Sequence, residues 1–128
     1  MRFEYKHFAF IGAESTQAAE AAECANEQGQ FWPYHNTLFA NQRGENVGAF
    51  RDAALKNFAA AIGLDEAAFN ECLDSGRHSQ VIQTEIEEGR ERGVESTPTL
   101  FINGERINGA IPFDQLETLI QIQLGISE

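Results

Sequence analysis

Residues 95–106 read ESTPTLFINGER, which combines a proline, an apolar β-prone run and an Asn-Gly pair. Asn103-Gly104 is the strongest two-residue signal for a β-hairpin, so the pattern predicts a strand on each side of it. Because Pro98 has no N–H to give to a ladder, we expect it at the first position of a strand or in the turn before it. An X-Pro bond in a tight turn can be cis at a cost of about 0.5–1 kcal/mol. The stretch therefore predicts a hairpin entered through a proline loop.

Length and composition favour one domain with its own core. At 128 residues and 42% hydrophobic content, the chain can bury a core without metals or disulfides as staples. Its formal charge of -11 argues against a nucleic-acid partner, because phosphate binding depends on clustered Lys and Arg. There is no run of eighteen apolar residues, and residues 1–4 lack the layout of a secretion signal. No membrane insertion is expected.

The hydrophobic pattern predicts a strand, a series of helices, a hairpin and a last helix. The strand is expected over residues 3–10, which are rich in aromatic side chains. A helix that starts near Phe31 is expected to turn Trp32 and Phe39 toward the core. Besides this helix, the pattern predicts helices over about 15–28, 53–62, 66–74, 78–92 and 113–124.

Three segments carry a resemblance to a known family. They are AAEAAECA with QGQFWPYH in residues 18–35, FNECLDSG in residues 69–76, and GVESTPTLFING in residues 93–104. In this order they resemble the helical insertion and the cis-proline loop of DsbA-type (BdbD-like) thiol:disulfide oxidoreductases. The resemblance implies an α/β, thioredoxin-like fold forming a single domain over residues 1–128. Within it, the helical insertion would cover about 13–92, and the cis-proline hairpin and C-terminal helix would cover 93–125.

The chain departs from that family in one respect. Such proteins begin with a strand and a helix that carries a Cys-x-x-Cys, whereas this chain begins at the match to the second strand and has no Cys-x-x-Cys. The sheet would be truncated at its N-terminal side, leaving two strand edges open. The flanking strands could pair directly, another copy could lend a strand, or upstream residues could fill the gap. We expect a homodimer or a strand-exchanged oligomer.

The resemblance assigns substrate binding to Thr97 and Pro98. In the family, the residue before the cis-proline pairs its backbone groups with an extended substrate, which is a form of strand addition. The implied partners are extended peptides or proteins that contain cysteine. No catalytic residue is predicted in this chain.

Cys24 and Cys72 are far apart and fit neither a zinc ribbon nor a thioredoxin-type redox pair. A reactive thiol needs positive charge or a helix N-terminus nearby, and Cys24 instead has Glu20 and Glu27 on its own helix. Neither cysteine is therefore expected to be a nucleophile. The resemblance implies that these two positions are joined as a structural disulfide in exported relatives, although the residues themselves allow them to be merely buried. A bridge would stabilise the chain by about 4 kcal/mol through loop closure.

The three histidines are not predicted to bind a metal or a cofactor. His35 lies among aromatic residues on one helical face and is expected at the margin of the core. His7 and His78 have no carboxylate or second histidine at ligand spacing. No metal site and no cofactor are expected.

The expected function is that of a DsbA-family thiol:disulfide oxidoreductase, which exchanges disulfides in protein substrates, with this chain inactive because the Cys-x-x-Cys is missing. One alternative is a non-catalytic peptide-binding module that uses the proline loop. Another is a truncated gene product. The resemblance implies a periplasmic or extracytoplasmic setting, but the chain shows no signal peptide, and its compartment stays unknown.

Overall fold

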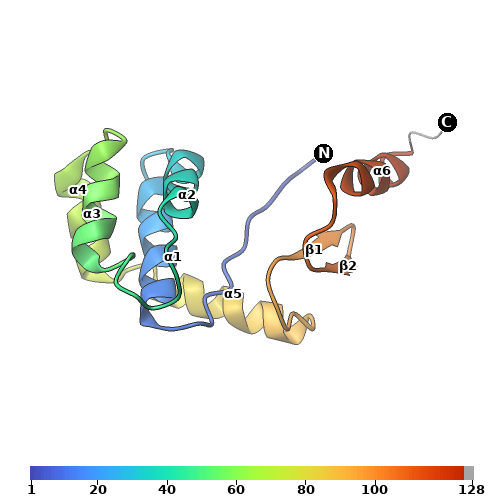
Figure 1. Ribbon diagram of the computed structural model, residues 1–128, viewed down its shortest axis with the longest axis horizontal. Helices are drawn as coiled ribbons and strands as arrows, with labels where there is room; N and C mark the ends of the chain where they lie inside the picture. The colour runs from blue at the N-terminus through green and yellow to red at the C-terminus, as the bar shows by residue number, and fades with distance from the viewer. Residues whose placement is uncertain (126–128) are drawn as a thin grey trace. The chain divides into compact units, whose positions relative to one another are not determined.

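The computed structural model describes residues 1–125, which divide into two compact units. A helical unit comprises His7–Glu87, and a hairpin unit comprises Met1–Lys6 and the chain from Glu88 onward. The boundary falls inside helix α5, Ser79–Glu91. Figure 1 labels the helices and strands, which together make a mixed α/β chain.

Four helices build the helical unit together with the first part of α5. They are α1 (Ala13–Asn26), α2 (Phe31–Ala40), α3 (Asp52–Ala61) and α4 (Glu66–Ser75). Helix α1 contacts each of the other three, as Figure 1 shows. It can do so because its buried side is mostly alanine, which lets neighbouring helices approach closely. The other helices supply the bulk of the core through Tyr34, Leu55 and Phe69, none of which is exposed.

Helix α2 begins at Phe31 as predicted, but it turns a different side to the core. The Tyr34 hydroxyl donates a 2.9 Å hydrogen bond to the Leu55 carbonyl, and the Tyr34 ring lies 5.4 Å from that of Phe69. Two residues of helix correspond to about 200° of rotation, so Trp32 lies on the other side of α2 from Tyr34. The prediction that Trp32 and Phe39 face inward is therefore wrong, since they are 44% and 68% exposed.

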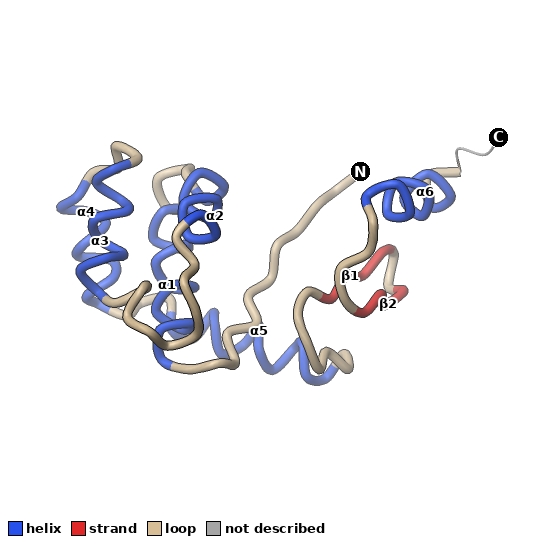
Figure 2. Tube along the Cα trace, in the orientation of Figure 1, coloured by secondary structure: helices blue, strands red, loops and turns tan. Residues whose placement is uncertain are grey.

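Residues 3–10 do not form the predicted strand and are drawn as loop in Figure 2. A strand requires a partner backbone, and no described residue pairs with this segment in a ladder. Part of the segment is instead held by side chains. The His7 N–H donates to a Glu85 carboxylate oxygen at 3.2 Å, while Phe8 and Ala9 pack against the cluster of Ala19, Ile82 and Ile86.

The hairpin unit contains the predicted β-hairpin. Strands β1 (Thr99–Ile102) and β2 (Glu105–Asn108) are antiparallel, with Leu100 opposite Ile107. Both turn residues have a positive φ, 49° for Asn103 and 86° for Gly104, which is the geometry that favours this pair in a two-residue turn. The Asn-Gly signal in the sequence is thus confirmed.

Helix α6 (Phe113–Gln123) follows the hairpin and contacts β1. Its apolar face is covered only in part, because none of its residues is fully buried. Leu116, Leu119 and Ile120 are half-buried, while Leu124, just beyond the helix, is exposed. None of the helices within residues 1–125 is both long enough and apolar enough to cross a membrane.

Candidate functional site

The loop between α5 and β1 carries Thr97 and Pro98, and the peptide bond between these two residues is cis. Hydrogen bonds fix the loop at both ends. The Val94 N–H donates to the Gly89 carbonyl at 2.9 Å, and the Gly109 N–H donates to the Pro98 carbonyl at 2.9 Å. The bond between Gly109 and Pro98 extends the backbone pairing of the hairpin by one contact, just before Thr99, the first residue of β1.

Thr97 is exposed at the tip of this loop. Its backbone N–H, its carbonyl and its hydroxyl make no hydrogen bond with any other residue in the described range 1–125. A neighbouring contact stiffens the loop, because the Thr99 hydroxyl donates to the Ser96 carbonyl at 2.7 Å. Thr97 thus presents a backbone donor and acceptor on a short, anchored loop, which is what an extended ligand needs for strand-like pairing.

Arg106 ties the hairpin to the end of α5. One guanidinium nitrogen, Nη1, donates to the carbonyl of Arg92 at 3.2 Å and to that of Gly93 at 2.9 Å. The Arg92 guanidinium in turn lies 3.9 Å from the centre of the Phe101 ring, a cation–π contact. These contacts set the position from which the loop of Thr97 starts.

The second group of predicted residues lies in the helical unit, where a disulfide joins Cys24 of α1 to Cys72 of α4. The bridge closes a separation of 48 residues and connects two helices of the main core. Both cysteines are buried at 2% exposure, and they are the chain's two cysteines, so no free thiol remains. This arrangement suits a structural cross-link.

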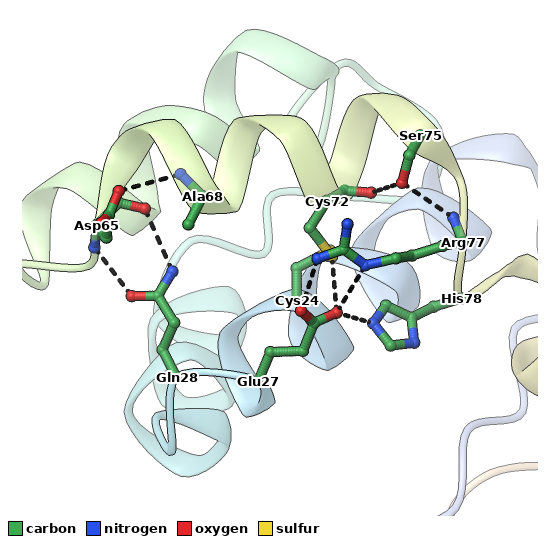
Figure 3. Close-up of polar contacts among 9 residues, drawn as sticks. All are labelled: Cys24, Glu27, Gln28, Asp65, Ala68, Cys72, Ser75, Arg77 and His78. Atoms are coloured by element: carbon green, nitrogen blue, oxygen red, sulfur yellow. Dashed lines mark hydrogen bonds and ion pairs between the residues drawn. A yellow bond between two sulfur atoms is a disulfide. The ribbon is translucent and has the colours of Figure 1, made fainter.

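Glu27 lies against this disulfide together with Arg77 and His78 (Figure 3). Arg77 donates to both carboxylate oxygens, from Nη2 at 2.6 Å and from Nε at 3.0 Å, and His78 Nε2 contacts Oε2. The hydrogen bonds from Arg77 and then from His78 lower the pKa of Glu27 to about 2. Glu27 Oε2 also lies 3.2 Å from Cys72 Sγ, which carries no hydrogen in a disulfide and cannot donate.

The sequence places no carboxylate at ligand spacing from His7 or His78, but the fold brings a distant carboxylate to each of them. Buried His7 has its Nε2 atom 2.8 Å from Glu23 Oε1, and this hydrogen bond lowers the pKa of Glu23. His78 meets Glu27, four residues after Glu23 and just past the end of α1. The sequence did contain a signal, since glutamates at spacings of three and four line one face of a helix. The histidines they would meet lie in distant segments, which local spacing does not reveal.

His35 has a different setting. Its ring lies within 6 Å of those of Phe31, Trp32 and Phe39. Its Nδ1 atom is 3.4 Å from the side-chain oxygen of the adjacent Asn36. This half-buried position, in an aromatic group on α2, agrees with the expected margin of the core.

The sequence matches the family described as Thioredoxin over residues 1–122. This chain therefore belongs to the Thioredoxin family, and the predicted α/β, thioredoxin-like fold class is confirmed. Membership of this family indicates a redox type of function.

The curated relatives carry a different name. The chain is 32% identical over 122 residues to Na(+)/H(+) antiporter NhaA 1 of Salinispora arenicola, covering 94% of this chain and 18% of that protein. It is 33% identical over 93 residues to Na(+)/H(+) antiporter NhaA of Herminiimonas arsenicoxydans, covering 73% of this chain and 14% of that protein. The chain thus spans less than one fifth of the length of these relatives. No solved structure matches it.

Proposed function

We propose that this chain is a DsbA-type thioredoxin domain that aligns extended protein substrates for disulfide exchange. The observation that carries the proposal is the exposed, anchored Thr97 loop, whose backbone donor and acceptor have no partner within residues 1–125. A substrate strand would pair with Thr97, and Pro98 would border the bound segment. Membership of the Thioredoxin family supports this reading.

The chain holds the aligning part of the reaction and not the attacking sulfur. Exchange begins when a thiolate attacks a disulfide sulfur and forms a mixed disulfide. Both cysteines of this sequence are consumed in a buried bridge. We therefore expect no dithiol oxidase activity and no insulin-reducing activity from the 128-residue chain. Turnover at the rate of a thioredoxin, measured by insulin turbidity under a thiol reductant, would contradict this part of the proposal.

Substrate alignment is tested by binding. Fluorescently labelled extended peptides that contain one blocked cysteine are titrated into the chain and followed by anisotropy. Thr97→Pro removes the backbone donor and is expected to weaken binding by about tenfold, the equivalent of one backbone hydrogen bond of about 1.4 kcal/mol. Thr97→Ala keeps both backbone groups and is the matched control, expected to bind as the wild type does.

Equal binding by the two variants would overturn the proposed role of Thr97. Far-UV circular dichroism and the urea midpoint of each variant show whether the hairpin unit is retained. Equal affinity for extended peptides with and without a cysteine would favour the second candidate, a non-catalytic peptide-binding module, because alignment for disulfide exchange requires a cysteine in the bound segment. The observation that favours this candidate is that the sequence contains no cysteine besides the bridged pair.

We also propose that a second copy of this chain pairs with the hairpin. Within residues 1–125 the sheet has two strands, and an isolated hairpin of two strands is marginally stable in water. Helix α6 adds no fully buried residue, and Phe113 is 76% exposed. Sedimentation velocity over a range of concentrations tests for the homodimer or strand-exchanged oligomer, and a monomer at every concentration would contradict it.

A further inference from the structure

The helical unit gathers four potential metal ligands from three segments. The sulfur atoms of Cys24 and Cys72 and a ring nitrogen of His78 all lie within 4.8 Å of one another. Glu27 Oε2 lies beside them, 3.2 Å from Cys72 Sγ and in contact with His78 Nε2. Figure 3 shows these side chains converging from α1, from α4 and from the turn before α5.

We propose that this cluster becomes a Zn²⁺ site when the disulfide is reduced. A dithiol reductant supplies two electrons and two protons, so the S–S bond breaks, Cys24 and Cys72 become thiols, and the reductant closes its own disulfide. Zn²⁺ then binds both sulfurs as thiolates, and the two thiol protons pass to water. His78 is the third ligand, and Glu27 Oε2 is the fourth.

The donor set is suited to Zn²⁺, which prefers four ligands drawn from Cys, His and carboxylate in a tetrahedron. With Zn–S distances of about 2.3 Å, two tetrahedral sulfur ligands stand about 3.8 Å apart. The Cα atoms of the two cysteines are 5.8 Å apart, so rotation of the side chains is enough to open the sulfurs to that separation. His78 and Glu27 need no long movement, because they already lie within reach.

Charge and access agree with a dication at this point. Two thiolates and Glu27 supply three negative charges, while Zn²⁺ and Arg77 supply three positive charges. Arg77 would remain on the second oxygen, Glu27 Oε1, which it already contacts at 2.6 Å, and would orient the carboxylate as outer partners of metal ligands do. The sulfurs are buried, but the His78 and Glu27 side chains are 21% and 38% exposed, so the metal can enter from their side.

Such a site would exchange one cross-link between α1 and α4 for another. Under oxidising conditions the disulfide connects the two helices. Under reducing conditions the metal would hold the same helices through the same two residues, so the helical unit would keep its core in either state. This property is independent of peptide binding at Thr97 in the other unit.

The test uses the full chain reduced with a phosphine, which takes its oxygen from water, and then freed of reductant under nitrogen. Co²⁺ is the probe, because tetrahedral thiolate ligation gives it strong visible absorption, and Zn²⁺ should displace it. We expect one Co²⁺ per reduced chain and none for the oxidised chain. Competition with a chromophoric chelator gives the Zn²⁺ affinity.

The variants separate a built site from loose binding by thiols. His78→Ala is expected to weaken Zn²⁺ binding at least about tenfold, the lower range for changes around metal sites. His35→Ala is the matched control and should leave the affinity unchanged, because His35 lies among aromatic rings on α2. Equal affinity in these two variants, or no thiolate spectrum in the reduced wild type, would overturn the proposal.

Reduction of the disulfide could also unfold part of the helical unit. Far-UV circular dichroism detects this as a loss of helical signal. If helical signal is lost on reduction, Zn²⁺ should restore it in the wild type and in His35→Ala but not in His78→Ala. Loss of signal that Zn²⁺ does not restore would contradict the site.

Discussion

Gly93 ends α5 in a conformation that a side chain would disturb twice. Its φ is 81°, a left-handed value that costs an L-residue about 1–2 kcal/mol. A Cβ at this position would also overlap Arg106 Nη1, which bonds the Gly93 carbonyl. The glycine therefore permits both the end of the helix and the arginine contact that precedes the Thr97 loop.

Gly93→Ala should destabilise the chain more than Gly63→Ala does. Gly63 has nearly the same φ, 80°, but a Cβ there would have no atom within 4 Å, so it reports the backbone cost alone. Displacing Arg106 should add about 1 kcal/mol, the usual contribution of a hydrogen bond. Urea unfolding of both variants measures the difference. Equal losses would mean that the Arg106 contacts contribute nothing to stability.

Glu14 organises the loop between α2 and α3 from the first turn of α1. Its carboxylate accepts the N–H of Gly48 at 3.0 Å and that of Phe50 at 3.2 Å. Glu14→Ala should cost about 1.5–3 kcal/mol, since two donors lose a charged acceptor, and should speed hydrogen exchange at these two amides. Glu45→Ala, which removes the same charge from an exposed position in that loop, is the control. Unchanged exchange at Gly48 and Phe50 in Glu14→Ala would contradict this role.

Single residues could be located from the sequence where the signal was local. The Asn103-Gly104 turn follows from the backbone preferences of two adjacent residues, and the structure contains this turn. The partners of His7 and His78 could not be found in the same way, because each meets a glutamate that is distant in the sequence. Side-chain pairs between segments depend on how the helices pack, which short-range patterns do not specify.

Among the helices, the first turn of α4 is held both by a side-chain cap and by contacts with Gln28. The Asp65 carboxylate accepts the Ala68 N–H at 3.0 Å, which satisfies one of the free donors at the helix start. The Asp65 N–H donates to Gln28 Oε1 at 2.9 Å, and Gln28 Nε2 donates back to the Asp65 carbonyl at 3.2 Å (Figure 3). The capping residue thus also anchors α4 to the turn that follows α1.

Asp65→Ala should cost about 1 kcal/mol, because the Ala68 N–H would lose its acceptor while the backbone contacts to Gln28 could remain. Asp65→Asn keeps a side-chain oxygen and should stay close to the wild type. Chemical denaturation compares the two. A loss as large in Asp65→Asn as in Asp65→Ala would show that the negative charge, and not the capping oxygen, carries the effect.

Helices were easier to predict than the first strand for a physical reason. Most backbone groups of a helix bond within the helix itself. Its ends are marked by nearby residues, such as the Asp65 cap and the terminator Gly76 with a φ of 63°, which can be recognised locally. A strand needs a second strand, and residues 3–10 have none among the described residues. Aromatic content alone therefore predicted a strand that the structure does not form.

For the whole chain, the Cys24–Cys72 bridge makes a large contribution to stability that can be removed by mutation. Cross-linking residues separated by 48 positions restricts the unfolded chain, and the loop-closure argument assigns this about 4 kcal/mol. Cys24→Ala/Cys72→Ala should lower the free energy of unfolding by about that amount, measured in urea. The metal-free wild type under a phosphine reductant should approach the variant, and a loss below about 1 kcal/mol would contradict the estimate.

The position of Trp32, described with α2, has a practical consequence for optical measurements. It is the single tryptophan of the chain, it is 44% exposed, and its ring lies 5.2 Å from that of His35. Intrinsic emission will therefore report the surroundings of one side chain on the outer side of one helix. A fluorescence melt should for this reason be read beside a signal from the backbone, because loss of structure elsewhere in the chain need not change the surroundings of Trp32.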